Sequence, residues 1–167
     1  MEKNSNIDLI YQYTASLLKE QGDSLNRLDT KLSAFLGFGG LTLRFALNLP
    51  SKPWHESLQN PAYLSCLILK VITCILAGAC VFICAFGLTA SLRGIAVDPK
   101  ELMDDEWFQR EEEICKGYII SAWIKITDEF EIVGKRKGQT LNIAIWCISI
   151  AIIAFAANIA ISTIYIQ

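Results

Sequence analysis

Histidine is almost missing from this sequence, and so are the motifs that would mark an enzyme. His55 is its only histidine. The chain contains no phosphate-binding loop, dinucleotide fingerprint or metal-ligand spacing, and no nucleophile has a base at a recognisable spacing. Carboxylates crowd together over residues 104–113, but acidic residues near the start of a helix are typical of a solvated face and not of acid–base catalysis. We therefore expect a protein without enzymatic activity, cofactor or metal.

Signal peptides and disulfides are also lacking. The first residues, MEKNSNID, do not show the basic-then-apolar pattern of a cleaved signal peptide, so we expect the first membrane helix to serve as the insertion signal. The six cysteines form no disulfide framework. Cys80 and Cys84 stand one helical turn apart in an apolar run with no histidine or carboxylate near them in sequence. They are therefore expected to pack as small hydrophobic residues and not to bind a metal.

Charge is absent from residues 140–166, which read TLNIAIWCISIAIIAFAANIAISTIYI. A helix of about 20 mostly apolar residues crosses a hydrocarbon core about 30 Å thick, so this run predicts a transmembrane helix. Residues 62–92 predict a second one, and residues 32–49 form a short third candidate with one charge, Arg44. Because Arg44 lies near the far end of that segment, its side chain either snorkels to the headgroups or has an intramembrane role. The same segment offers three small residues for a close helix contact: Ser33, Gly37 and Gly40.

Amphipathic helices precede two of these spans. Apolar residues recur at spacings of three, four and seven between residues 7 and 32, and again from Trp107 to Val133. Asp98 and Pro99 fit the start of the second helix. Each amphipathic helix is expected to run directly into the span that follows it, and to pack against its neighbours or another subunit. The apolar face of the first helix consists of Ile7, Ile10, Tyr11, Leu17, Leu18, Leu25, Leu28 and Leu32.

Positive charge indicates the orientation. Lysine and arginine are concentrated before residue 32 and between residues 93 and 139, so the positive-inside rule places the N-terminus and residues 93–139 in the cytoplasm and the C-terminus outside. The chain is 53% hydrophobic. We therefore predict an all-α integral membrane protein with long amphipathic cytoplasmic helices, assembled as a homo-oligomeric bundle. Its expected segments are a cytoplasmic amphipathic helix at 1–31, a two-helix transmembrane hairpin at 32–92, a cytoplasmic helical segment at 93–139 and a third transmembrane helix at 140–167.

The last span carries a stripe of small and weakly polar residues at spacings of three and four. Such a stripe has two explanations. It is either a close helix contact across which an asparagine side chain forms a hydrogen bond, or the lining of a narrow polar path through a closed homo-oligomer, such as a tetramer. The stripe consists of Ala144, Cys147, Ala151, Ala154, Asn158 and Ser162.

A cluster of three cations, Lys135, Arg136 and Lys137, lies immediately before the last span. It is either a positive-inside anchor or a patch that binds the phosphates of a lipid or nucleotide. The cytoplasmic helices add further positive charge at Lys19, Arg27 and Lys125.

The run Leu28–Gly37, LDTKLSAFLG, resembles a pattern in small bacterial anti-phage effectors of the SLATT and Pycsar types. In those families an Asp-x-Lys step precedes a glycine-bearing first span, followed by a second span and a cytoplasmic helix. The chain departs from them in having no separate nucleotide-sensing domain and in ending with a third span, which is more similar to the membrane effector of the Hailong system. The likeness in layout covers residues 25–110.

This resemblance implies a function at the bacterial inner membrane. It implies a channel or membrane-disrupting effector that acts in abortive infection, gated through its cytoplasmic helices by a nucleotide or a single-stranded DNA oligomer from a partner nucleotidyltransferase. The ligand would then bind the six cations of the cytoplasmic helices, which are Lys19, Arg27, Lys125, Lys135, Arg136 and Lys137. The alternative is a non-conducting membrane adaptor that recruits a cytoplasmic partner protein.

Overall fold

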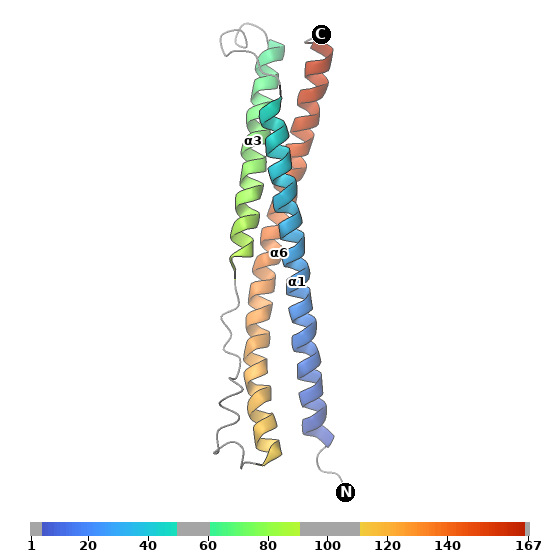
Figure 1. Ribbon diagram of the computed structural model, residues 1–167, viewed down its shortest axis with the longest axis vertical. Coiled ribbons are helices and arrows are strands. Elements are labelled where there is room, and N and C mark those ends of the chain that lie inside the picture. Colours follow the sequence, from blue (N-terminus) through green and yellow to red (C-terminus); the bar gives the residue numbers. More distant parts are fainter. Residues whose placement is uncertain (1–4, 50–60, 91–110, 166–167) are drawn as a thin grey trace. The chain divides into compact units, whose positions relative to one another are not determined.

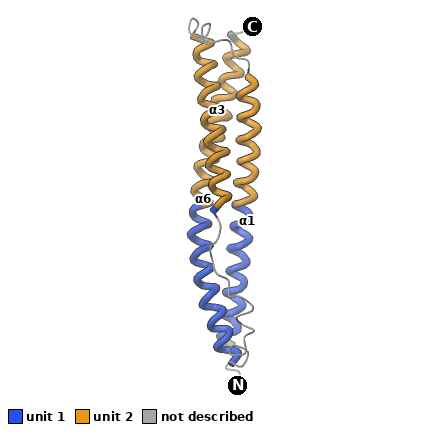
Figure 2. Tube along the Cα trace, turned by 60° about the vertical axis from the view of Figure 1, so that its left-hand side comes forward, with its two compact units in different colours: residues 1–28, 90–136 blue, residues 29–89, 137–167 orange. Residues whose placement is uncertain are grey.

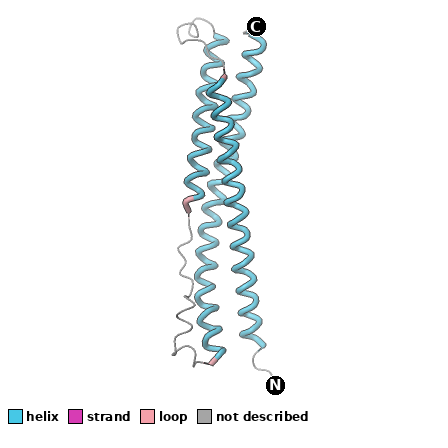
Figure 3. The backbone as a smooth tube through the Cα atoms, in the orientation of Figure 1, coloured by secondary structure: helices cyan, strands magenta, loops and turns pink. Residues whose placement is uncertain are grey.

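The computed structural model of this protein describes residues 5–49, 61–90 and 111–165, and these residues form three helices and no strand (Figures 1 and 3). The helices are α1 (Ser5–Asn48), α3 (Pro61–Leu88) and α6 (Glu112–Tyr165). Two of them, α3 and α6, are long and apolar enough to cross a membrane. The predicted all-helical class is therefore confirmed for the described residues.

Both amphipathic helices continue into the apolar segments that follow them, as the sequence predicts. Helix α1 runs for 44 residues and α6 for 54 residues without interruption. Helix α1 ends just before Pro50, because a residue that precedes proline is pushed out of the helical region. Helix α6 begins at Glu112, where two carboxylates in the first turn favour a helix N-terminus. The start predicted at Asp98 and Pro99 lies outside the described residues.

Buried residues follow a seven-residue period on all three helices. A period of 3.5 residues per turn is that of helices wound around one another with side chains interlocking along a seam. On α1 the buried positions include Leu25, Leu32, Gly39 and Ala46. On α3 they are Thr73, Ala77, Cys80, Cys84 and Gly87, and on α6 they include Lys137, Leu141, Ala144, Ile148, Ala151 and Asn158.

The chain divides into two compact units, shown in different colours in Figure 2. Unit 1 comprises residues 1–28 and 90–136, and unit 2 comprises residues 29–89 and 137–167. The segment borders expected from the sequence, after residues 31, 92 and 139, lie three residues beyond each of these divisions.

Unit 1 pairs the first part of α1 with the first part of α6 in parallel. Lys116 of α6 forms an ion pair with Asp8 of α1. The rings of Tyr11 and Trp123 lie 4.8 Å apart, centroid to centroid. Further along, Leu25 lies over Gly134, where an added Cβ would be 3.6 Å from Leu25 Cδ2.

Unit 2 is a three-helix bundle in which α3 runs antiparallel to α1 and α6. Its helices approach closely because many of the residues along their contact faces are small. A Cβ added at Gly87 would lie 2.8 Å from Thr140 Cγ2 and 3.2 Å from Leu32 Cδ1. One added at Gly39 would lie 3.0 Å from Val81 Cγ2. The close contact expected at Ser33, Gly37 and Gly40 is not made within this chain, since these residues are exposed and nothing lies within 4 Å of a Cβ at either glycine.

Candidate functional site

Most of the outer surface of unit 2 is apolar on all three helices. Large hydrophobic side chains point away from the bundle, among them Phe45 of α1 (58% exposed), Phe82 of α3 (74%) and Ile153 of α6 (69%). Soluble monomers rarely expose contiguous apolar surface on this scale. A hydrocarbon solvent suits such a surface, so unit 2 associates with a membrane.

The predicted stripe on α6 faces the inside of this bundle. Ala144 and Ala151 are fully buried, Ala154 and Asn158 are nearly so, and Cys147 and Ser162 are half-buried. Asn158 Nδ2 donates a hydrogen bond of 2.6 Å to the carbonyl oxygen of Cys66 on α3. Within one chain the stripe is therefore occupied by helix contacts, and the asparagine amide is satisfied away from water.

Lys137 forms a buried ion pair where the apolar sections begin. Its Nζ lies 2.6 Å from Asp29 Oδ1 on α1, and its side chain is only 6% exposed, against 38% for Asp29. A charge with so little access to water depends on its partner, because removing that partner leaves the charge uncompensated. Lys137 is thus bound to its own chain, unlike the exposed cation expected for a ligand patch.

The other two cations of the cluster are exposed. Lys135 pairs with Glu131 one turn earlier on α6, with 2.6 Å between Nζ and Oε1. The hydrogen bond from Lys135 lowers the pKa of the Glu131 carboxyl. Arg136 is also exposed and has a polar interaction of its own. The cluster therefore splits into one inward and two outward cations, as expected when three successive residues fall on different sides of a helix.

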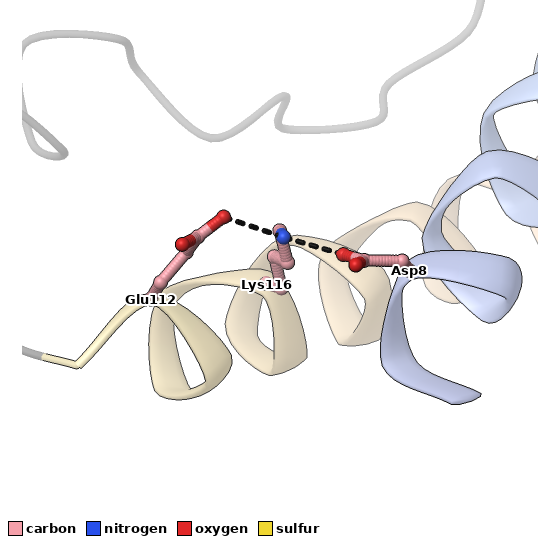
Figure 4. Close-up of polar contacts among 3 residues, drawn as sticks. All are labelled: Asp8, Glu112 and Lys116. Atoms are coloured by element: carbon pink, nitrogen blue, oxygen red, sulfur yellow. Dashed lines mark hydrogen bonds and ion pairs between the residues drawn. The ribbon is translucent and has the colours of Figure 1, made fainter. Parts of the chain in front are cut away.

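A second ion-pair site, which the sequence analysis missed, lies in unit 1 (Figure 4). Lys116 Nζ lies 2.5 Å from Asp8 Oδ1 and 2.6 Å from Glu112 Oε1. Hydrogen bonds to these two carboxylates raise the pKa of Lys116 above its ordinary value. Lys116 precedes Lys137 by 21 residues, and Asp8 precedes Asp29 by the same distance. Three seven-residue repeats separate the two pairs on both helices. Steps of seven residues back along the sequence from Ala144 reach Lys137 and then Lys116, so this period could have identified both lysines.

Lys19 and Arg27 come together in a shallow hollow on α1. The hollow contains two cations, two carboxylates and two hydroxyls, so its formal charges cancel. Lys125 is exposed on α6 but does not line this hollow. The residues that line it are Ser16, Lys19, Glu20, Asp23, Ser24 and Arg27.

At the far end of the α1 apolar section, Lys70 Nζ donates a hydrogen bond of 2.7 Å to the carbonyl oxygen of Leu49. A cation at this position compensates the negative end of the α1 dipole. The α1 section between Asp29 and Leu49 is about 20 residues, or roughly 30 Å at 1.5 Å per residue, close to the thickness of a hydrocarbon core. Arg44 is exposed within this section, near enough to its end for the long side chain to reach headgroups.

Among the described residues, no group of three histidine, cysteine or acidic side chains is placed to hold a metal ion. Cys80 and Cys84 are buried in the seam, and the Cys80 thiol lies 3.9 Å from the carbonyl oxygen of Phe35. No family model matches the sequence, and no curated protein or solved structure matches it either.

Proposed function

We propose that this protein is a homo-oligomeric effector of the bacterial inner membrane, either a channel or a membrane-disrupting protein, controlled through unit 1. The observation that carries this proposal is the continuity of α1 and α6, each of which joins a charged section to an apolar one. Each of these helices gives a ligand bound in unit 1 a continuous backbone connection to an apolar section in unit 2.

We further propose that α1 crosses the membrane together with α3 and α6. Its apolar section has the required length and is bounded by Asp29, paired with Lys137, at one end and by the Lys70-capped Leu49 at the other. Three crossings place the N-terminus and residues 93–139 in the cytoplasm and the C-terminus outside, in agreement with the distribution of lysine and arginine.

A conducting path would have to form between copies, since the seam of a single bundle is filled by its own side chains. A tetramer or a similar closed ring satisfies this requirement. The proposed signal is an anionic nucleotide or single-stranded DNA oligomer made by a partner nucleotidyltransferase, and the defence role rests on the resemblance at residues 28–37. Lys19 and Arg27, which share a hollow, are the best-placed cations to contact it, with Lys125, Lys135 and Arg136 as further candidates.

Ligand control is tested by measuring potassium efflux from liposomes that contain the purified protein, before and after adding a short single-stranded DNA. We expect the oligomer to change the efflux, and Lys19→Ala with Arg27→Ala to weaken that response. Asp23→Ala, in the same hollow, removes a negative charge and should strengthen it. If none of the three substitutions alters the change in efflux caused by DNA, the hollow is excluded as the ligand site.

A second candidate function, a non-conducting adaptor, is favoured by the burial of the α6 stripe and by apolar side chains exposed on unit 1. Leu9 and Tyr13 are each 66% exposed, and Ile132 is 68% exposed. Such residues suit the binding of a cytoplasmic partner protein. In that case Ala151→Leu would disrupt the bundle, and liposomes containing the wild-type protein would show no efflux with or without ligand.

A further inference from the structure

The outward face of α6 in unit 2 carries polar and small residues where lipid would favour bulky apolar ones. Asn142, Ser149, Ala156 and Thr163 recur every seven residues on this face, with Trp146 and Ile153 between them. Asn142, Ala156 and Thr163 are exposed and Ser149 is half-buried. We call this face the outer line; it lies on the side of α6 opposite the buried seam.

Asn142 is the residue on the outer line that is least suited to contact with lipid. It lies five residues beyond Lys137, inside the apolar section, and makes no hydrogen bond within the part of the chain that the structure describes. An exposed amide in hydrocarbon has no water to satisfy it, and each unsatisfied polar group there is costly. Its position therefore calls for a partner that offers both a donor and an acceptor at the same depth in the membrane.

We propose that the outer line of α6 is the contact with a second copy of this chain. Copies inserted in the same orientation present this face in parallel, so a symmetry axis beside α6 brings Asn142 opposite Asn142. The two amides are self-complementary, since each one donates and accepts. The small residues at seven-residue intervals let two such helices approach closely, and the bulky residues between them fill the gaps.

The same face of α6 within unit 1 independently favours a helix partner. Ile114, Tyr118 and Ile132 lie on it at spacings that continue the pattern, and they are 49%, 39% and 68% exposed. Two parallel copies would therefore offer each other apolar side chains to bury.

This inference rests on the homo-oligomer in the proposed function, but it does not depend on conduction. It is tested by disulfide cross-linking in native membranes under a mild oxidant. Ser149→Cys is compared with Ile150→Cys, which is 48% exposed on a neighbouring face, and both are measured against the dimer formed by the native cysteines. We expect a dimer with Ser149→Cys that is several-fold above that background, and none above background with Ile150→Cys.

A second variant keeps the test independent of cysteine chemistry. Asn142→Leu should lower the association constant in detergent or nanodiscs by about 3- to 30-fold, the effect of losing one interhelical hydrogen bond in a membrane. Ile143→Leu, beside it, should not change association. Equal cross-linking at residues 149 and 150, with association unchanged in Asn142→Leu, would overturn the proposal. Cross-linking at residue 149 without ion efflux would support the interface and exclude the channel. Efflux without that cross-link would support the channel and exclude this interface.

Discussion

At the scale of single residues, the ion pair between Lys137 and Asp29 is a short contact of unit 2 whose cation is nearly buried. Its ammonium group is almost sealed from water, while the carboxylate keeps partial access. Replacing Lys137 with methionine keeps the length of the side chain but leaves Asp29 without its partner. We expect a loss of about 1.5–3 kcal/mol, typical of a hydrogen bond to a charged group, measured as a fall in thermal stability in detergent.

The matched control for Lys137→Met is Lys135→Met, two residues away. Lys135 is 74% exposed and its pair with Glu131 lies on the helix surface, so its loss should leave the thermal stability almost unchanged. Equal effects from the two substitutions would show that the buried pair does not hold α1 to α6.

Gly87 supports a second prediction at this scale. Because a Cβ there would be 2.8 Å from Thr140 Cγ2, Gly87→Ala should overpack the seam and destabilise the bundle by about 1–3 kcal/mol. Gly78→Ala on the same helix meets no atom within 4 Å and should be neutral or stabilising by up to about 1 kcal/mol. Thermal unfolding in detergent compares the two variants. A Gly87→Ala variant as stable as the wild type would mean that α3 does not pack tightly against Thr140.

Lys116 gives unit 1 a dependence on alkaline pH. Since its pKa is raised in the folded state, the stability it contributes is fully present below its ordinary value of 10.5 and is lost as pH rises through the raised folded value. Thermal unfolding between pH 8 and pH 12 should therefore show wild type losing its advantage over Lys116→Met only at the alkaline end. The substitution Lys125→Met, at an exposed lysine, should not alter the pH profile, and an advantage of wild type that is independent of pH would contradict the ion-pair account.

At the scale of elements, the sequence predicted the helices better than it predicted their faces. The apolar period between residues 7 and 32 and the charge-free run after residue 140 were sufficient for α1 and α6. The close approach to α3 uses Gly39, which the sequence analysis did not name, and not Gly37 or Gly40, because two lines of small residues on one helix look alike until the partner helix is known. The direction of Lys137 was missed because a run of cations beside a span is ordinarily an anchor.

The continuity of α1 and α6 makes a prediction of its own. Three glycines inserted after both Leu28 and Arg136 should leave the stability of unit 2 unchanged and abolish control of ion efflux by DNA, because a flexible joint does not transmit rotation. Seven helix-forming residues inserted at the same two places preserve both helix faces and should preserve control. Liposome efflux separates the two variants, and a response that survives the glycines would rule out transmission along the helices.

At the scale of the whole molecule, only the membrane class was accessible from composition and hydropathy. The sequence offered two explanations of the α6 stripe, helix contact and pore lining, and no single-chain pattern can separate them. The structure places those residues within one bundle and leaves a different face of α6 exposed, on which Asn142, Ser149 and Thr163 interrupt the apolar side chains. A function that depends on several copies is consequently argued from the outer surface and not from the core.

The most direct test of the central claim is potassium efflux from liposomes as a function of the protein-to-lipid ratio. A homo-oligomeric effector predicts efflux that rises more steeply than linearly with protein density, because several copies must meet before a path forms. Liposomes that stay ion-tight at ratios where cross-linking shows associated copies, with and without a DNA oligomer, would contradict this function.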